Sequence, residues 1–262
     1  MKISVIGAGA MGGSLAEGLT KIKSVKNTDI CVADPFAASL KKLEKTGVTL
    51  TTDNKAAAKG ADIVAVVVKP WITEKVLTEI KDVMDYKKQL LIVVAAGVSS
   101  ENINLWLKKK GQATLPFFLV IPNIAIAMLS SMTFIVPVGA KAEQTKKVAA
   151  LFDEMGESIV VEEKQLGAGT TLASCGIAYA MRYIRAAVEG GVELGFKAKD
   201  AEKIVEQTVK GAVELLQATG EHPEALIDQV TTPGGVTIKG LNEMERSGFT
   251  NSVISGLKAG AK

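Results

Sequence analysis

The sequence has few cysteines and histidines, two residue types that often bind metals. It contains two cysteines, Cys31 and Cys175, and one histidine among 262 residues. The cysteines lie far apart and match no metal-ligand spacing, so no metal site is expected. Cys31 lies in an expected buried strand, where a free thiol suits a reducing cytoplasm. The lone His222 precedes Pro223, a position typical of a turn or helix cap rather than of a catalyst.

Long apolar runs and an excess of charge of one sign are also lacking. No run approaches the roughly 20 apolar residues that span a bilayer, and no apolar signal segment stands at the N-terminus. The net charge is +3, and lysines and arginines are spread along the chain, which gives no sign of nucleic-acid binding. We therefore expect a cytoplasmic protein that binds neither membranes nor nucleic acids.

Apolar residues make up 47% of the chain, enough to bury a substantial core. In the first half, short runs rich in Val, Ile and Leu alternate with helical patterns, as in buried parallel strands joined by right-handed crossovers. The sequence predicts an α/β fold with a Rossmann-type, doubly wound, mostly parallel sheet. Helices are expected at 35–47 and at about 141–154, and strands at 2–7, 29–34, 61–70, 89–97, 113–123, 131–139 and 156–161.

Strand patterns stop after residue 162, and helical patterns follow to the C-terminus. We therefore expect a boundary near Glu162, with domains 1–162 and 163–262. The helices of the second part are apolar on many faces, and such helices need partners. They could form an intertwined dimer, or they could fold back onto the sheet domain as a monomer. Exposed apolar faces favour the association.

The stretch GAGAMG at 7–12 fits the pattern G-x-G-x-x-G, with a strand before it and a helix after it. Asp34 ends the second strand, 22 positions after Gly12. This combination is typical of dinucleotide binding. Gly7 permits the tight turn, Gly9 lets the backbone approach a pyrophosphate, and Gly12 lets the helix pack closely. The helix N-terminus then presents free N–H groups to the phosphates. A glycine turn without a ligand is the disfavoured alternative.

Asp34 also bears on the choice of coenzyme. A carboxylate at the end of the second strand accepts hydrogen bonds from ribose hydroxyls and repels a 2′-phosphate. This favours NADH, or at least tolerance of it. Alternatively, Asp34 stands before Pro35 and caps the next helix. The two roles are compatible.

Other strand ends are expected to line the same crevice, because ligands of open α/β sheets bind at the carboxyl ends of the strands. These ends are VKP at 68–70, AAG at 95–97 and IPN at 121–123. Lys69 is either a structural residue at the end of its strand or a residue that holds a ribose or a phosphate. The sequence by itself favours neither role.

A second informative stretch, TTPGGVT at 231–237, combines hydroxyls, a proline and two glycines between helical segments. Free N–H groups at the start of the following helix could hold an anionic group such as a carboxylate. Thr232 and Thr237 would add hydroxyl donors. The same stretch is equally compatible with a simple connector between two helices.

Together these motifs resemble the pyrroline-5-carboxylate reductase family over essentially the whole chain. The matching stretches are IGAGAMGGSLAEGL, VVKP, AAGVS, IPN and, most specifically, LIDQVTTPGGVTIKGLNEME. The resemblance implies a Rossmann domain followed by a helical dimerisation domain, in a homodimer or an assembly of dimers. It also implies reduction of L-1-pyrroline-5-carboxylate to L-proline with NAD(P)H, the last step of proline biosynthesis, without a metal.

The resemblance also implies roles for individual residues. Together with Asp34, the coenzyme-binding residues would be Gly7, Gly9, Ala10, Met11, Gly12, Asn54, Lys69, Pro70, Ala96 and Gly97. The substrate carboxylate and ring nitrogen would be held, across the dimer interface, by Thr232, Gly235, Val236 and Thr237. Hydride reduces a cyclic imine only when its nitrogen is protonated or strongly hydrogen-bonded, and positioning supplies much of the rate. Thr237 is therefore the candidate catalytic residue, since no Asp, Glu or His stands out as a general acid.

Three stretches depart from the family pattern. The family usually reads Ser-Gly-Ser-Gly-Pro-Ala-Tyr where this chain has ASCGIAY at 173–179, and often Pro-Asn-Thr-Pro where it has PNIAI at 122–126. Asp34 is the third, because many relatives carry residues there that suit NADPH. The changes are either drift that preserves packing or signs of another small carboxylate imine or ketone as substrate. A further alternative is a non-catalytic NAD(P)-binding regulator.

Overall fold

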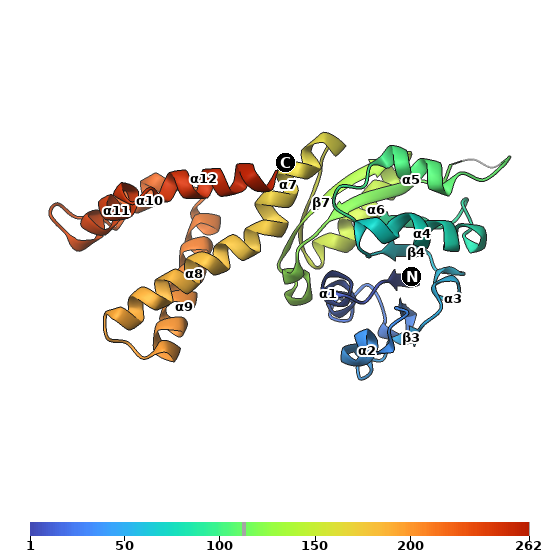
Figure 1. Cartoon of the computed structure of the whole chain (residues 1–262), viewed down its shortest axis with the longest axis horizontal. Coiled ribbons are helices and arrows are strands. Elements are labelled where there is room, and N and C mark those ends of the chain that lie inside the picture. Colours follow the sequence, from blue (N-terminus) through green and yellow to red (C-terminus); the bar gives the residue numbers. More distant parts are fainter. Residues whose placement is uncertain (112–113, 262) are drawn as a thin grey trace. The chain divides into compact units, whose positions relative to one another are not determined.

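The computed structural model describes residues 1–111 and 114–261. The chain divides into two compact units, Met1–Ser174 and Cys175–Lys262 (Figure 1). The first unit contains the sheet, and the second contains only helices. The start of the strand expected over 113–123 falls at Ala113, which lies outside the described residues.

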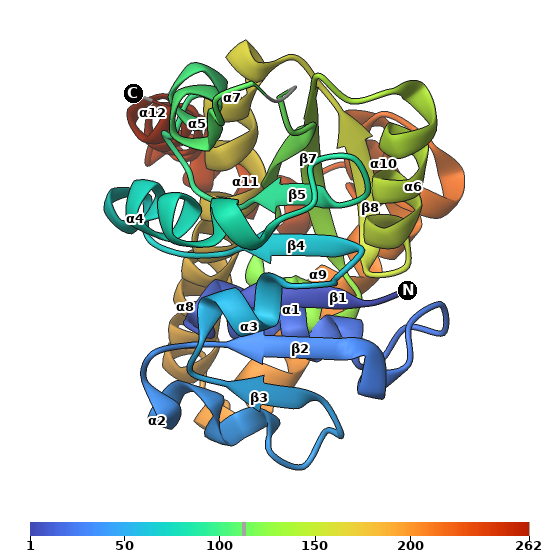
Figure 2. The ribbon, with the colours of Figure 1, turned by 90° about the vertical axis from the view of Figure 1, so that its right-hand side faces the viewer.

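The first unit is built on an eight-stranded sheet of order β3-β2-β1-β4-β5-β6-β7-β8. Strands β1 to β6 are parallel, β7 pairs antiparallel with β6, and β8 runs parallel to β7. Figure 2 shows the arrowheads of β2, β3 and β4 at one edge of the sheet. The strands are β1 Ile3–Ile6, β2 Ile30–Ala33, β3 Thr49–Thr51, β4 Ile63–Val66, β5 Leu90–Val93, β6 Phe117–Ile121, β7 Ser131–Val138 and β8 Gly156–Val160.

Helices cover both faces of this sheet. Side chains of α1 and α6 pack in one hydrophobic core, and those of α3, α4 and α5 pack in the other. Successive residues of β4 alternate between the two cores, because side chains alternate across a strand. This explains why the central strands are apolar throughout. The helices are α1 Ala10–Leu19, α2 Ala37–Leu40, α3 Asn54–Ala58, α4 Pro70–Ile80, α5 Ser100–Leu107, α6 Ala142–Asp153 and α7 Leu166–Gly169.

The predicted α/β fold is confirmed, with two differences in detail. The edge strand β3 was not predicted, because it has only three residues and two of them are threonines. The helix expected over 35–47 is shorter, since α2 ends at Leu40 and a 3₁₀ turn follows at Lys41–Leu43. That segment buries only Leu40 and Leu43, which gives a longer helix too few apolar anchors. The helix expected at about 141–154 is confirmed by α6.

The first unit extends past its last strand. After β8 the chain forms a 3₁₀ turn, α7 and a π-helical turn at Thr170–Cys175. The Ser100 N–H donates to Glu163 Oε1 at 2.8 Å, and Asn123 Nδ2 donates to the Ala173 carbonyl at 3.4 Å. These bonds hold residues 163–173 against the sheet unit. The compact unit therefore ends at residue 174, whereas the boundary predicted at 162 marks the end of the strands.

The second unit consists of α8 Gly176–Glu193, α9 Ala198–Thr219, α10 Pro223–Gln229, α11 Val236–Arg246 and α12 Phe249–Gly260. Tyr183 of α8 meets Phe249 of α12 edge-on, with ring centroids 6.4 Å apart. Among its described residues, only Val188, Ala201 and Leu226 are buried apolar side chains. The unit by itself therefore has a very small core, and most of its apolar side chains are exposed.

Both cysteines are free thiols, and both are half-buried. Cys31 lies in β2, and Cys175 directly precedes α8. Burial raises the pKa of the Cys31 thiol. Because the thiolate is the reactive form, Cys31 is poorly reactive near neutral pH.

Ser4 in β1 offers a test of the core. Its Oγ is buried and has no hydrogen-bond partner among the described residues, and burying an unpaired hydroxyl costs about 1–3 kcal/mol. We expect Ser4→Ala to raise the free energy of unfolding by about 1 kcal/mol, measured by urea denaturation. The matched control is Ser131→Ala, which should lower it, because Ser131 Oγ accepts the Asn123 N–H at 3.1 Å. A less stable Ser4→Ala variant would contradict the unpaired state.

Candidate active site

The glycine loop joins the end of β1 to the start of α1. Gly7 has φ +102°, in the left-handed region, and its N–H donates to the Ala33 carbonyl at 2.7 Å. A Cβ at Gly7 would collide with the Val67 carbonyl oxygen, and a Cβ at Gly12 would collide with the Gly7 carbonyl oxygen. Both positions therefore need glycine for the loop and helix to pack as they do.

Gly9 differs from the other two glycines. It is the N-cap of α1, with φ −64° and ψ −169°, a conformation open to any residue. A Cβ added there would meet nothing within 4 Å. No side chain caps α1, and its first turn carries no acidic residue. The fold does not require this glycine, and the uncapped helix N-terminus leaves room beside it for an anionic group such as a phosphate.

Asp34 follows β2 and is 8% exposed. Its Oδ2 accepts the Ala8 N–H at 2.7 Å, and its Oδ1 accepts the Phe36 N–H at 2.9 Å. The carboxylate therefore ties the glycine loop to the turn after β2. It does not cap α2, whose N-cap is Phe36 without a side-chain bond. Each carboxylate oxygen keeps a lone pair for a further donor.

Asn54 is the first residue of α3, directly after its N-cap Asp53. Its Nδ2 donates to Glu79 Oε2 of α4 at 3.1 Å. Its Oδ1 is buried and has no partner among the described residues. Buried acceptors are nearly always paired, so this orphaned oxygen fits a bound hydroxyl group. Sequence reasoning missed Glu79, because a contact across 25 positions leaves no local pattern.

The remaining predicted coenzyme residues follow β4 and β5. Lys69 is the N-cap of α4, and Pro70 is its first residue. Ala96 and Gly97 follow β5 and are exposed, and Gly97 has φ +79°. Because β1 to β5 are parallel, all the predicted coenzyme residues come to one edge of the sheet, the edge of the arrowheads in Figure 2.

The predicted substrate residues lie together at the start of α11 in the second unit. Gly235 is the N-cap, and its N–H donates to the Thr232 carbonyl at 2.9 Å. A Cβ at Gly235 would collide with Thr232 Oγ1, and Gly234 has φ +72°. Val236 is 86% exposed, and Thr237 follows it in the first turn. No side chain caps α11, so its first N–H groups are available to an anion.

The two stretches that depart from the family pattern, PNIAI and ASCGIAY, contact each other. Asn123 of PNIAI accepts the Ala125 N–H at 3.0 Å, and its Nδ2 donates to the Ala173 carbonyl of ASCGIAY.

The helix-cap prediction for the lone histidine is confirmed, because His222 is the N-cap of α10 and its Nδ1 accepts the Glu224 N–H at 3.2 Å.

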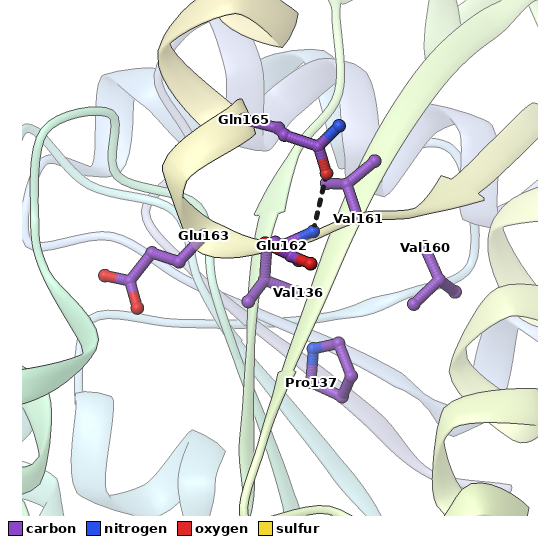
Figure 3. A pocket seen from close by; sticks show the side chains of 7 residues that line it. All are labelled: Val136, Pro137, Val160, Val161, Glu162, Glu163 and Gln165. Atoms are coloured by element: carbon purple, nitrogen blue, oxygen red, sulfur yellow. Dashed lines mark hydrogen bonds between the residues drawn. The ribbon is translucent and has the colours of Figure 1, made fainter.

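The structure also contains a pocket of about 630 Å³ that no motif predicted (Figure 3). Within it Gln165 Oε1 accepts the Glu162 N–H at 3.0 Å, a pairing that the E-x-x-Q spacing could have revealed. In the sheet order, β4, β5 and β6 separate it from β1. It is therefore no part of the glycine-loop site. Its lining residues are Val136, Pro137, Val160, Val161, Glu162, Glu163 and Gln165.

Metal-binding clusters and membrane-spanning helices are both absent from the described part of the chain. Residues 1–111 and 114–261 contain no group of three His, Cys, Asp or Glu side chains that could hold a metal ion. Within the same residues, no helix has the length and apolar character needed to cross a bilayer.

A parallel sheet whose first strand ends in a glycine loop at a helix N-terminus is the scaffold of dinucleotide-dependent oxidoreductases, and the first unit belongs to this class. Family models agree with this class. One described as NADP oxidoreductase coenzyme F420-dependent matches residues 2–97. Another, described as pyrroline-5-carboxylate reductase dimerisation, matches residues 163–262.

Individual relatives identify the family. The chain is 37% identical to pyrroline-5-carboxylate reductase 1 of Dictyostelium discoideum, with 97% of this chain covered but only 48% of that protein. It is 33% identical to the pyrroline-5-carboxylate reductase of Arabidopsis thaliana, with 100% and 93% covered. The solved reductase of Coxiella burnetii has a TM-score of 0.87 at 29% identity, with 99% and 96% covered. The chain belongs to the pyrroline-5-carboxylate reductase family.

These findings confirm the predicted family, the reductase class and a coenzyme of the NAD(P) type. The match to a dimerisation model supports the predicted homo-oligomer. The chain spans about half the length of the first Dictyostelium relative and more than nine tenths of the plant one. The roles of individual site residues stay predictions.

Proposed function

We propose that this chain reduces L-1-pyrroline-5-carboxylate to L-proline with a reduced nicotinamide dinucleotide. The observation that carries dinucleotide binding is the glycine loop between β1 and the uncapped N-terminus of α1, beside the Asp34 carboxylate. The hydride-transfer class follows from the reductase family to which the chain belongs. The substrate is inferred from relatives that match over essentially the whole chain, the loop before α11 included.

The coenzyme, when bound, supplies the hydride. Backbone N–H groups of Ala10 and Met11, in the first turn of α1, bind its pyrophosphate. Asn54 accepts a hydrogen bond from the adenosine ribose, and its orphaned Oδ1 supports this role. The residues that line the rest of the coenzyme are Lys69, Pro70, Ala96 and Gly97.

The loop at the start of α11 holds the substrate. The N–H groups of Val236 and Thr237 bind the carboxylate, with Thr232 and Gly235 shaping the turn. The Thr237 hydroxyl hydrogen-bonds the ring nitrogen. As the C=N bond is reduced, the hydride adds to the ring carbon and the nitrogen gains a proton from solvent or arrives already protonated. Holding the ring in one orientation supplies much of the rate.

The helical unit forms the dimer interface in this proposal. Its exposed apolar side chains need a partner, and the dimerisation model covers the same residues. A second copy, in a dimer or an assembly of dimers, would cover this surface. We also place the protein in the cytoplasm, where its two free thiols stay reduced. The apolar side chains include Leu194, Phe196, Ile204, Val213, Leu215, Val230, Val253 and Ile254.

The test is steady-state oxidation of NADH and of NADPH by the purified protein with pyrroline-5-carboxylate, beside a substrate-free control. We expect turnover that depends on the substrate. Coenzyme binding without turnover would contradict the proposal, and would favour either another small carboxylate substrate or a non-catalytic NAD(P)-binding regulator.

A further inference from the structure

We propose that this chain selects NADH over NADPH because Asp34 is fixed at the place of the coenzyme's 2′-substituent. The proposal rests on the dinucleotide site proposed above, but it does not depend on the identity of the reduced substrate. Three features support it at the carboxyl ends of β2 and β3, which we call the corner. They are a carboxylate that cannot move away, an amide oxygen without a donor among the described residues, and a shortage of cations.

The Asp34 carboxylate is held at both oxygens. One oxygen accepts the Ala8 N–H of the glycine loop at 2.7 Å, and the other accepts the Phe36 N–H at 2.9 Å. Both donors are backbone groups, so the carboxylate cannot rotate away without breaking the loop or the turn after β2. An exposed aspartate could swing aside for a phosphate, but Asp34 is only 8% exposed.

The register of the sheet places this carboxylate beside the ribose. Ala33 at the end of β2 lies level with Ile6 at the end of β1, directly before the glycine loop. Neighbouring strands lie about 4.8 Å apart, so Asp34 stands one strand away from the pyrophosphate site. The Asp34 N–H also donates to the Thr51 carbonyl at 3.2 Å, and Asn54 follows three residues later. Asp34 and Asn54 therefore flank the same corner.

The corner presents acceptors rather than donors. The Asn54 amide nitrogen donates to Glu79, and its buried oxygen has no partner among the described residues. With the Asp34 carboxylate, this oxygen suits the two ribose hydroxyl groups, which are donors. A 2′-phosphate has only acceptor oxygens and a negative charge, so it would find repulsion where the hydroxyl finds hydrogen bonds.

Cations that could neutralise a 2′-phosphate are scarce at this corner. NADPH-binding sites usually place an arginine near the end of the second strand. Here residues 35–40 contain no lysine or arginine, and the first cation is Lys41. Lys55 adjoins Asn54, but it stands in the first turn of a helix that the Asp53 carboxylate caps. The carboxylates of Asp34, Asp53 and Glu79 outnumber it.

The test measures coenzyme binding without substrate. Dissociation constants for NADH and NADPH are obtained from the fluorescence of the reduced nicotinamide. We expect NADH to bind at least about tenfold more tightly than NADPH, because the 2′-phosphate of NADPH would stand against the Asp34 carboxylate. Asp34→Ser should tighten NADPH binding and reduce that ratio severalfold. The matched control is Asp62→Asn, which also removes a carboxylate bonded to a backbone N–H, that of Lys2 at 2.8 Å. Asp62 directly precedes β4 and Lys2 directly precedes β1, so this bond lies at the opposite edge of the sheet from the coenzyme residues. The ratio of the two dissociation constants should therefore stay unchanged.

Competition in the unaltered protein gives a readout that needs no variant to fold. ADP-ribose should displace NADH better than 2′-phospho-ADP-ribose does. Equal or tighter binding of NADPH by the unaltered protein, or an unchanged ratio in a folded Asp34→Ser variant, would overturn the inference. NADH preference without turnover of pyrroline-5-carboxylate would leave this inference standing and reject the proposed reaction. Turnover of pyrroline-5-carboxylate by a protein that binds NADPH more tightly would support the proposed reaction and overturn this inference.

Discussion

Replacing Gly9 by alanine should weaken coenzyme binding strongly and leave the fold intact. The backbone at Gly9 is ordinary, and a Cβ there meets nothing within 4 Å, so the folded chain tolerates the methyl group. A pyrophosphate packed on the helix N-terminus would meet that methyl group. Overpacking of this kind costs about 3 kcal/mol, which weakens binding roughly 100-fold. Nicotinamide fluorescence measures the binding, and a thermal melt measures the fold.

Two neighbouring glycines provide the controls for Gly9→Ala. Gly12→Ala should lower the melting temperature strongly, because its Cβ would collide with the Gly7 carbonyl oxygen. Gly13→Ala places its Cβ 3.4 Å from the Ala8 carbonyl oxygen, an ordinary contact. It should bind coenzyme normally and gain about 0.5–1 kcal/mol from helix propensity. Normal coenzyme binding by Gly9→Ala would contradict a phosphate site and favour a glycine turn without a ligand.

Replacing Thr237 by valine should lower kcat about 100-fold, the usual cost of removing one hydrogen bond to the reacting group in the transition state. Valine has nearly the shape of threonine, and Thr237 lies in the first turn of α11, so the helix should persist. The variant loses only the hydroxyl assigned to the ring nitrogen. Steady-state kinetics with saturating coenzyme measure the effect, and Thr237→Ser should recover most of the activity.

Thr250→Val is the matched control for Thr237→Val. Its hydroxyl donates to Glu245 Oε2 at 2.8 Å in the same unit, away from the loop before α11. Activity of this variant should be unchanged, and both variants should keep the oligomeric state of the unaltered protein by light scattering. An unchanged kcat in Thr237→Val would show that the backbone N–H groups and solvent suffice, which would remove Thr237 as the catalytic residue.

Features encoded in consecutive residues could be predicted from the sequence. The glycine loop is one, because its spacing, the strand before it and the helix after it lie within about twenty residues. The central strands are another, since they are buried on both faces and therefore apolar throughout. The edge strand β3 escaped prediction because three residues with two threonines carry no such run.

The sequence by itself determined the class of fold, the family motifs and the residue types available to the site. Only the tertiary structure decided what Asp34 does, because its partner Ala8 lies 26 positions away. It also decided that the Asn54 amide donates to Glu79 of another helix and that no described residue pairs with its oxygen. Each of these depends on contacts between residues far apart in the chain, and local periodicity carries no record of such contacts.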